Sequence, residues 1–430
     1  NDFQIDTVAG EWRYNGDKAG SRVLGDLTTD WTHFAVVYDG KNTKMYINGV
    51  QKWYIENKND NVFQHYCLGV NRGASDFFTG LIDDFRFYTD ALDGAAISAL
   101  ADVSLHNFPV LIRLRDGLDG FSYKQVKSLR GGDLRFLDTA GNELPYSIDE
   151  WNTDGESAVW VSFDEFSLNG ETKFSMHWGN PDATAVPPYA TNGSAWQDFL
   201  LVTHLGETNH IVDVSPQGVN GPGTSNVNQP TLGIIGGART FIADNNSIIF
   251  PARDKNPNSL TASAWFFFTK VPGNDETFFY TRTWTPGDVR AYFHDTNANG
   301  TRFRYEVHSG NPKDIGRSPY PGPITGEDTN KWTHITTVYD LDAKRYTFYK
   351  NGDVFHTTTI GNAKPANVSS KGIVLGANEN GNWREMRSAN IDQFEVSGVA
   401  RSQAWIKTSV EAEKVGSDLL STSNFSGPPE

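Results

Sequence analysis

The sequence predicts an all-β, multidomain protein built from β-sandwiches. Aromatic residues make up 13% of the 430 residues, and there are 41 glycines but only 3 methionines. This mix favours strands joined by tight turns over helical bundles. A second observation is an internal repeat, because residues 31–39 (WTHFAVVYD) return at 332–340 as WTHITTVYD. Short strands that alternate with turn residues in this way are typical of a sandwich.

The blocks of the repeat follow in the same order in both copies. Each copy continues with a short strand and the dipeptide Asn-Gly, at Asn48 and Asn351, which is a strong signal for a two-residue hairpin turn. Residues 82–85 (IDDF) match 391–394 (IDQF) and are expected to form the last strand. A short helix is expected after it, at residues 93–102 in the first copy and 403–414 in the second, with Asp93 and Ser402 as their N-terminal caps.

The first copy of the repeat is incomplete. About 130 residues, starting near Ala195, precede Trp332 in the second copy, whereas only 30 residues precede Trp31. We therefore expect residues 1–103 to be the C-terminal half of a sandwich, with an open core and open strand edges. Residues 193–415 should form a complete domain. An upstream segment of the polypeptide, or neighbouring copies of the chain, would have to complete the N-terminal half-domain.

A different domain is expected between the two repeats. Residues 104–182 contain four strand-like runs separated by turn residues, at 108–114, 133–137, 158–163 and 173–178, and indicate a small β-rich domain. The proline-containing residues 183–192 should be a linker. The polar residues 416–430 end in Pro-Pro-Glu and are expected to be a further linker or a cut end.

The motifs of the repeats resemble those of laminin-G-like domains, which have a concanavalin A-like jelly-roll fold. The resemblance lies in the Trp-Thr-His blocks, the Asn-Gly hairpins and residues 80–88 (GLIDDFRFY). It also includes the opening of the second copy, at residues 204–207 (HLGE) and 213–218 (DVSPQG). The middle segment is similar to a bacterial domain of unknown function that commonly precedes such domains, with VWV at 159–161 and HWGN at 177–180.

This resemblance implies concanavalin A-like jelly-roll β-sandwiches with an intervening small β-sandwich domain. It also implies a secreted, extracellular, cell-surface or periplasmic protein that serves binding or adhesion rather than catalysis. The expected ligand is a polysaccharide or another surface component. Two alternatives stay open: a non-catalytic accessory region of a larger carbohydrate-active enzyme, and a structural subunit of an extracellular filament or matrix.

Charge and composition exclude several classes of partner. The chain has 37 basic and 52 acidic residues, a net charge of −15, which disfavours nucleic acid as a partner. Cys67 is the single cysteine, so the chain can form no internal disulfide. No run of about 18 apolar residues is present, and no membrane span is expected.

The resemblance further implies a structural calcium ion. Such domains often fix calcium with an acidic residue of the last strand and oxygens from the opening turn, which would be Asp392 with Glu207 and Asp213 in the second copy. Asp83 is the counterpart of Asp392 in the first copy. Calcium needs six to eight oxygen ligands, and the alternative is that these acids cap turns or form ion pairs.

Several aromatic residues near expected turns of the second repeat are candidates for stacking on sugar rings. They are Trp284, Tyr292, Tyr305 and Trp383. Asn378 and Arg384 are nearby polar residues that could bind sugar hydroxyls. The alternative is that the aromatic rings pack in the core, as most aromatic residues do.

No catalytic residue is predicted. His33 and His334 lie in alternating strands and are expected to be structural. The adjacent acids Asp149 and Glu150 would point to opposite faces of a strand, unlike the two facing carboxyl groups of a glycosidase. The Glu-x-Asp-x-x-Glu arrangement of jelly-roll glycosidases and the common hydrolase and nucleotide-binding motifs are absent. The sequence therefore argues against an enzyme.

Overall fold

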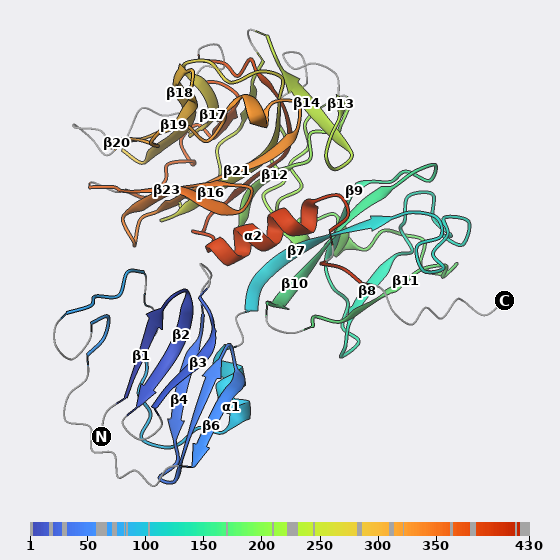
Figure 1. The fold of residues 1–430 in the computed structure, drawn as a ribbon. Coiled ribbons are helices and arrows are strands. Elements are labelled where there is room, and N and C mark those ends of the chain that lie inside the picture. Colours follow the sequence, from blue (N-terminus) through green and yellow to red (C-terminus); the bar gives the residue numbers. More distant parts are fainter. Residues whose placement is uncertain are drawn as a thin grey trace. The chain divides into compact units, whose positions relative to one another are not determined.

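The computed structural model is a mainly β structure with two short α-helices (Figure 1). It describes the whole chain except residues 1–2, 17–19, 28–31, 57–66, 71–74, 81, 83–84, 102–103, 169–170, 209, 222–230, 244–245, 282–285, 309–313, 321, 362–363, 379–383, 418 and 422–430. The chain divides into an N-terminal unit of residues 1–105 with 167–172, and a C-terminal unit of residues 106–166 with 173–430. Each unit is described by itself.

The N-terminal unit contains two three-stranded antiparallel sheets and one helix. The first sheet has the order β1 (Phe3–Val8), β2 (Glu11–Gly16), β3 (Gly20–Asp26), and the second β4 (Phe34–Tyr38), β5 (Asn42–Ile47), β6 (Val50–Glu56). Helix α1 spans Gly94–Ala101. Tyr14 and Leu24 of the first sheet pack against Met45 and Ile47 of the second. The two sheets therefore share one small core.

The C-terminal unit contains a complete sandwich of two sheets. The larger sheet has the order β13 (Thr231–Leu232), β14 (Gly237–Phe241), β25 (Ala389–Ser397), β16 (Leu260–Phe268), β21 (Trp332–Asp340), β22 (Arg345–Lys350), β23 (Asp353–Thr359), and β12 (Phe199–Thr203) also pairs with β25. The six-stranded sheet has the order β15 (Ile248–Phe250), β24 (Ile373–Leu375), β17 (Glu276–Tyr280), β18 (Asp288–Asn297), β19 (Gly300–His308), β20 (Asp314–Arg317). One large apolar core lies between them.

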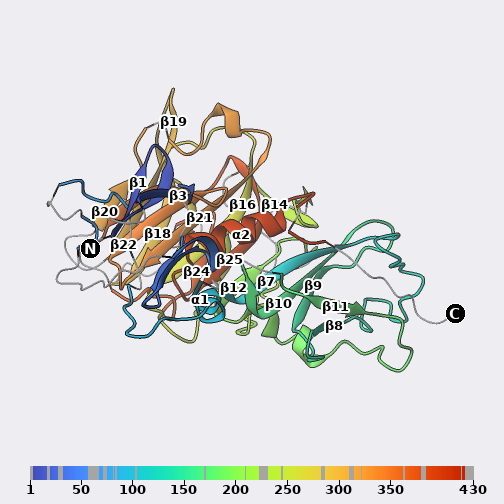
Figure 2. The same cartoon turned by 60° about the horizontal axis from the view of Figure 1, so that its bottom comes forward.

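The middle segment forms two small sheets within the same unit. A three-stranded sheet has the order β7 (Ser104–Leu114), β10 (Ser157–Ser167), β9 (Tyr146–Glu150), and β8 (Arg135–Asp138) pairs with β11 (Phe174–His177). Short 3-10 turns occupy Pro188–Ala190, Ser194–Trp196 and Gly326–Asp328. Figure 2 shows β8 to β11 grouped beside the sandwich.

Helix α2 (Gln403–Glu413) lies between the larger sheet and strand β7 of the middle segment (Figure 1). Ser402 caps its first turn by accepting a hydrogen bond from the Trp405 backbone N–H, as the sequence predicts. Trp405 contacts Phe108 of β7, with ring centroids 5.2 Å apart. Among the described residues, no helix is long and apolar enough to cross a membrane.

The predicted Asn-Gly hairpins are present in both units. Asn351 has φ 51° and Gly352 φ 88° between β22 and β23, and Asn48 and Gly49 have φ 49° and 74° between β5 and β6. The Asn351 side-chain oxygen also accepts a hydrogen bond from the His334 backbone N–H at 2.9 Å. Asn48 binds His33 in the same way, at 2.9 Å. In both units a hydrogen bond therefore joins the Trp-Thr-His motif to the Asn-Gly turn.

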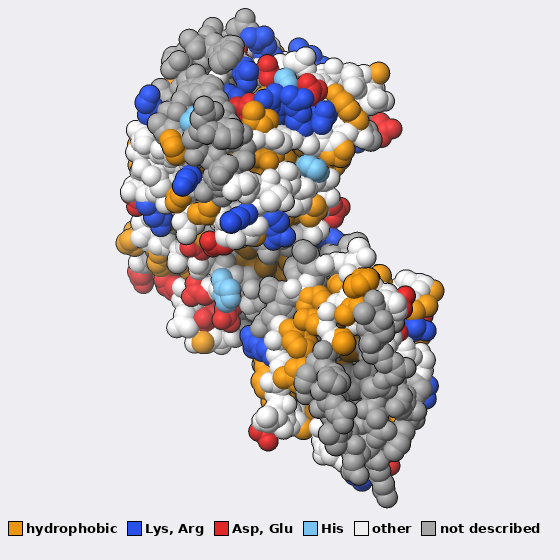
Figure 3. Space-filling view, turned by 90° about the vertical axis from the view of Figure 1, so that its left-hand side faces the viewer, with side chains coloured by type: hydrophobic (Ala, Val, Ile, Leu, Met, Phe, Trp, Pro, Cys, Tyr) orange, Lys and Arg blue, Asp and Glu red, His pale blue; other side chains and the backbone are white. Residues whose placement is uncertain are grey.

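The last strand of the repeat differs between the two units. In the C-terminal unit β25 pairs with β12, β14 and β16, and Phe394 on it is fully buried. In the N-terminal unit the matching Phe85 is 58% exposed and lies outside the strands that the structure describes there. Hydrophobic side chains also gather on the visible face of this unit (Figure 3). Among the described residues, no strand of the N-terminal unit therefore buries Phe85 as β25 buries Phe394.

The double role of Asn351 leads to a stability prediction. Asn351→Ala should destabilise the C-terminal unit by about 2–3 kcal/mol, because it removes a hydrogen bond worth about 1 kcal/mol and places a Cβ-bearing residue without a local polar group at positive φ. Asn351→Gly should cost only about 1 kcal/mol, because glycine keeps the backbone conformation. Calorimetric melting of the full chain measures both.

Asn48→Ala provides the matched control, because it breaks the same contact in the N-terminal unit. It should shift the melting transition of that unit and leave the transition of the C-terminal unit in place. Equal effects of the Ala and Gly variants at position 351 would contradict the backbone part of the explanation.

Candidate functional site

The outer face of the six-stranded sheet carries an unusual set of polar side chains. Val289, Ala291 and Phe293 of β18 and Phe303 and Val307 of β19 belong to the apolar core. Because side chains alternate along a strand, the residues between them face away from the core. These outward residues are Arg290, Tyr292 and His294 on β18 and Arg302, Arg304 and Glu306 on β19.

The strand register places these side chains in directly opposed pairs. Arg290 lies opposite Glu306, Tyr292 opposite Arg304, and His294 opposite Arg302. The Tyr292 hydroxyl donates to Glu306 Oε1 at 2.6 Å. Arg304 donates to the same oxygen at 2.8 Å, and Arg290 pairs with Oε2. One carboxylate therefore holds a phenol and two guanidinium groups.

Tyr292 is the centre of this buried layer. The guanidinium carbons of Arg290, Arg304 and Arg384 lie 4.7, 5.3 and 5.5 Å from its ring centroid, within the range of cation–π attraction. Burial, followed by the hydrogen bond to Glu306, raises the pKa of the Tyr292 hydroxyl above its ordinary value of 10. The hydroxyl therefore remains a hydrogen-bond donor at neutral pH.

A second, more exposed layer continues from the first. The Asp295 carboxylate pairs with Arg317 at 3.1 Å and with Arg302 at 3.5 Å. The Arg302 guanidinium lies 5.0 Å from the ring centroid of Tyr320, which is 38% exposed. In Figure 3 basic side chains, interspersed with acidic ones, gather on the visible face of this unit. This layer offers donors, acceptors and an aromatic surface to solvent.

The structure brings three of the six predicted ligand-binding residues together. Tyr292, Asn378 and Arg384 meet on this face, where Asn378 accepts a hydrogen bond from Arg290 at 3.1 Å. Tyr305 lies on the opposite side of β19 in the core, stacked on Tyr346 with centroids 4.6 Å apart. Trp284 and Trp383 lie outside the described residues.

Two of these residues differ from the expectation of exposed aromatic rings. Tyr292 and Tyr305 are both buried, so neither ring presents a free face for stacking in this conformation. Tyr320 carries the exposed ring instead. The sequence does contain a signal for the arginines that it did not single out: residues 302–308 (RFRYEVH) alternate charged and apolar side chains, so one face of this strand had to be polar.

The residues expected to hold calcium are engaged in other contacts. Asp213 is buried and pairs with the buried Arg253 at 2.7 Å. It also accepts hydrogen bonds from the backbone N–H groups of Val202, Ser215 and Val219. These four contacts of the Asp213 carboxylate fix the opening turn of the domain.

The other expected ligands do not assemble around Asp213. Asp392 accepts hydrogen bonds from the backbone N–H groups of Ile234 and Ile235 at 2.8 and 3.0 Å, and burial raises its pKa, which favours the neutral acid. Burial likewise raises the pKa of Glu207. Asp83 lies outside the described residues. In the part of the chain that the structure describes, no three His, Cys, Asp or Glu residues are grouped to hold a metal ion.

A third polar cluster joins the sandwich to the middle segment. His204 Nδ1 lies 2.6 Å from Gln393 Oε1 and 3.4 Å from Asp149 Oδ2, and Gln393 Nε2 donates to Asp149 at 2.9 Å. The His204 ring stacks on Trp160 of β10 at 6.2 Å. Because these groups are buried, we interpret the cluster as a structural junction.

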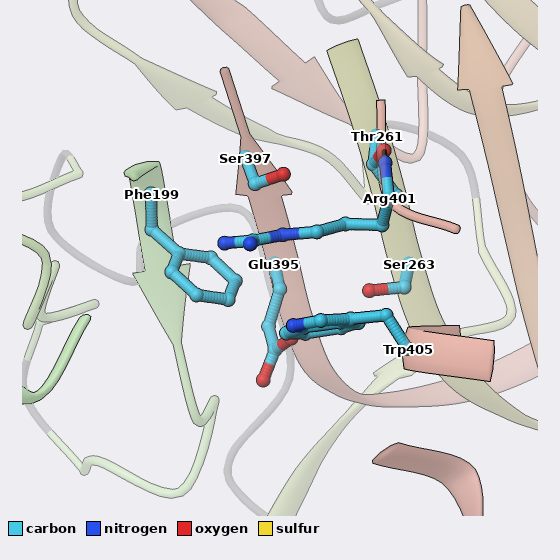
Figure 4. A pocket seen from close by; sticks show the side chains of 7 residues that line it. All are labelled: Phe199, Thr261, Ser263, Glu395, Ser397, Arg401 and Trp405. Atoms are coloured by element: carbon cyan, nitrogen blue, oxygen red, sulfur yellow. Dashed lines mark hydrogen bonds between the residues drawn. The ribbon is translucent and has the colours of Figure 1, made fainter. Parts of the chain in front are cut away.

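A small cavity lies under α2 (Figure 4). Its volume is about 10 Å³, and its walls are Phe199, Thr261, Ser263, Glu395, Ser397, Arg401 and Trp405. The Arg401 guanidinium lies 4.5 Å from the Trp405 ring centroid and 5.2 Å from that of Phe199. This volume is that of a single water molecule, so the cavity is too small for a sugar.

Comparison with known families agrees with this architecture. The family described as the concanavalin A-like lectin/glucanases superfamily matches residues 3–98 and 243–407. A domain of unknown function matches residues 130–200, in the middle segment and the chain that follows it. No curated protein matches the chain.

Solved structures with a similar fold include the binding domains of a neurotoxin and of a mosquitocidal protein. The botulinum neurotoxin serotype D binding domain is 17% identical, with a TM-score of 0.40, and the match covers 50% of this chain and 51% of that one. The serotype D ligand-binding domain in complex with N-acetylneuraminic acid is 16% identical, with a TM-score of 0.40 and 50% of each chain covered. The binding domain of Paraclostridial Mosquitocidal Protein 1 is 17% identical, with a TM-score of 0.40 and coverages of 50% and 52%. The match thus spans about half the length of each of these structures.

The Asp213–Arg253 ion pair leads to a second stability prediction. Asp213→Asn should destabilise the C-terminal unit by about 3–5 kcal/mol, because it leaves the Arg253 charge buried without its counter-ion. Asp254→Asn is the control, since the exposed Asp254 interacts with Gln217 at the surface and should change stability by less than about 1 kcal/mol. Chemical unfolding of the full chain measures both, and equal effects would show that the ion pair is not essential.

Glu413 at the end of α2 leads to a pH prediction. Burial raises its pKa to about 7, whereas an exposed glutamate titrates near about 4.3. The folded protein therefore binds this proton more tightly than the unfolded chain, so this contribution to stability is lost as pH rises from about 4.3 to 7. The melting temperature should therefore fall as the pH rises from about 4.3 to 7, and Glu413→Gln should make this fall smaller.

Glu411→Gln on the same helix is the matched control for this titration. The Glu411 side chain is exposed and pairs with Lys414, so its replacement should leave the slope unchanged. Melting curves of native protein and Glu413→Gln that stay parallel between pH 4 and 8 would refute the assignment to Glu413.

Proposed function

The chain belongs to the concanavalin A-like lectin/glucanases superfamily, and from this membership we propose that it is a carbohydrate-binding protein. The binding surface is the polar outer face of β18, β19 and β20 in the C-terminal unit. We further propose that the protein works outside the cytoplasm, in adhesion to a polysaccharide or another surface component.

One observation carries the proposal. A sheet face that only covers a core needs no particular side chains, but this one holds Tyr292, Glu306 and three arginines in a connected network. His294 links this buried layer to the exposed one, because its Nε2 lies 3.0 Å from Arg304 Nη1 and 3.0 Å from Asp295 Oδ1. Pre-positioned polar groups beside an aromatic ring suit a sugar, which has hydroxyl groups at its edge and an apolar ring face.

A specific observation favours a second candidate, that of a structural subunit of an extracellular filament or matrix. Phe77 and Phe85 of the N-terminal unit are 73% and 58% exposed. Large exposed apolar side chains close together in sequence mark surfaces that associate. Self-assembly of the full chain in sedimentation experiments would favour this candidate, whereas a monomer that binds glycans favours the first.

Retention of the full chain on immobilised polysaccharides tests carbohydrate binding. Native protein should bind at least one member of a panel of polygalacturonate, alginate, xylan, mannan and mixed-linkage glucan. Arg302→Gln should weaken that binding roughly 10-fold or more, because a hydrogen bond to a charged group contributes about 1.5–3 kcal/mol. Absence of reducing-end release during incubation would agree with binding without hydrolysis.

Lys414→Gln is the control variant, because it removes a positive charge at the end of α2, on the other side of the sandwich. It should bind as the native protein does. Native protein that binds no member of the panel, or an Arg302→Gln variant that binds as well as Lys414→Gln, would refute the proposed site.

A further inference from the structure

We propose that this face selects acidic polysaccharides, whose sugar rings carry carboxylate or sulfate groups, over neutral ones. The inference rests on the proposed function and specifies its ligand. It follows from the balance of charges on the face, from one pair of opposed arginines, and from a comparison between the two units of the chain.

The arginines of the face outnumber the carboxylates that hold them. Glu306 is shared by Arg290 and Arg304, and Asp295 is shared by Arg302 and Arg317. A guanidinium group has five N–H donors, and it binds a carboxylate best when the two pair one to one through two parallel bonds. Other acceptors engage part of the remaining N–H groups, since Arg304 Nη1 lies 3.0 Å from His294 Nε2 and Arg302 Nε donates to the Ser318 carbonyl oxygen at 2.6 Å. Donor capacity for an additional anion therefore lies mainly with Arg302 and Arg317, which share Asp295.

The surplus lies where solvent can reach it. The side chains of Arg317, Arg302 and Arg304 are 41%, 23% and 15% exposed. His294 lies between Asp275 and Asp295, at 2.9 and 3.0 Å, and burial lowers its pKa, so it does not add to the positive charge of the arginines at neutral pH. The available donors are thus those of the arginines at the corner formed by β19 and β20.

Two of these arginines oppose each other directly. Arg304 of β19 and Arg317 of β20 are register partners, so their side chains leave the same face of the sheet. Like charges at directly opposed positions destabilise an antiparallel pair. Glu306 and Asp295 each offset part of this repulsion from one side, and an anion placed between the two guanidinium groups would add two further attractive contacts.

The N-terminal unit shows that the fold does not require such a surplus. Its strands β1 and β2 precede β4 as β18 and β19 precede β21. On β1 and β2, Asp6 pairs with Arg13 at 3.1 Å and also accepts hydrogen bonds from Gln4 and Asn15. One cation there meets one carboxylate. The excess of arginines on β18 and β19 is therefore not repeated on β1 and β2.

The chemistry of the ligand follows from these contacts. Arginine binds carboxylate and sulfate oxygens through its planar fork, and the exposed Tyr320 ring beside Arg302 offers a surface for the sugar ring that carries the charge. A uronic acid or sulfated sugar supplies both parts. A neutral sugar would bring no further anion to the opposed arginines, which would keep only their shared partners Glu306 and Asp295.

Affinity electrophoresis of the full chain in gels that contain one polymer each tests the inference. The probes are polygalacturonate, its methyl ester, a sulfated galactan and neutral dextran. Native protein should bind polygalacturonate or the sulfated galactan at least 10-fold more tightly than the methyl ester and dextran. This preference should fall between 0.05 and 0.5 M NaCl, because salt screens exposed charges.

Substitutions of the arginines test whether the preference for acidic polymers comes from the outer face of β18, β19 and β20. Arg317→Gln and Arg302→Gln should each weaken binding of the acidic polymer on the order of 10-fold, whereas Lys414→Gln should not. Arg317→Lys keeps the charge without the fork and should recover only part of the affinity. Unchanged melting temperatures of the variants would show that the losses do not come from unfolding.

The outcomes separate this inference from the proposed function. Equal binding of polygalacturonate and its methyl ester, or of acidic and neutral polymers, would overturn the inference and leave carbohydrate binding in place. Binding of no polymer would overturn both. Acidic binding that is lost equally in Lys414→Gln would show general charge attraction and would also overturn the inference.

Discussion

Strand β25 is the element on which the rest of the C-terminal unit depends, because both of its faces must be covered. It pairs with β12, β14 and β16. Ile391 and Phe394 on it both belong to the core. Two residues lie between them, so in a regular strand their side chains would point to opposite faces of the sheet. A bulge makes this possible: the register with β16 shifts between Ser263 and Trp265, and Gln393 adopts φ 51°.

The bulge decides what each side of β25 contacts. The Asp392 carboxylate accepts hydrogen bonds from the backbone N–H groups of Ile234 and Ile235. The Gln393 side chain forms hydrogen bonds with His204 and Asp149 at the junction with the middle segment. Further along, Glu395 lies beneath α2. In the N-terminal unit, where the described strands include no counterpart of β16, Phe85 at the matching position is exposed. In the C-terminal unit, burial of Phe394 thus depends on the strands that pair with β25.

The sequence was sufficient to predict what local chemistry determines. The repeat, the Asn-Gly hairpins and the Ser402 cap depend on residues close in the chain, and the structure contains all three. Site residues were harder, because a shift of one position moves a side chain to the other face of a strand: Tyr292 faces the arginines and Tyr305 the core. The Asp149–Gln393 contact joins residues 244 positions apart, and local pattern gives no signal for such a pairing.

The net charge of the whole chain affects where an anionic ligand would bind. With a net charge of −15, most of the surface repels a polyanion, and the repulsion weakens with distance over roughly 10 Å at 0.1 M salt. An acidic polymer would therefore be held only where several guanidinium groups converge, and it would be excluded elsewhere. A uniformly basic protein would bind any polyanion at many places on its surface. In an acidic protein, by contrast, binding of a polyanion requires a local group of arginines. An anionic ligand would therefore meet its strongest local attraction at the corner where Arg304 and Arg317 stand opposed.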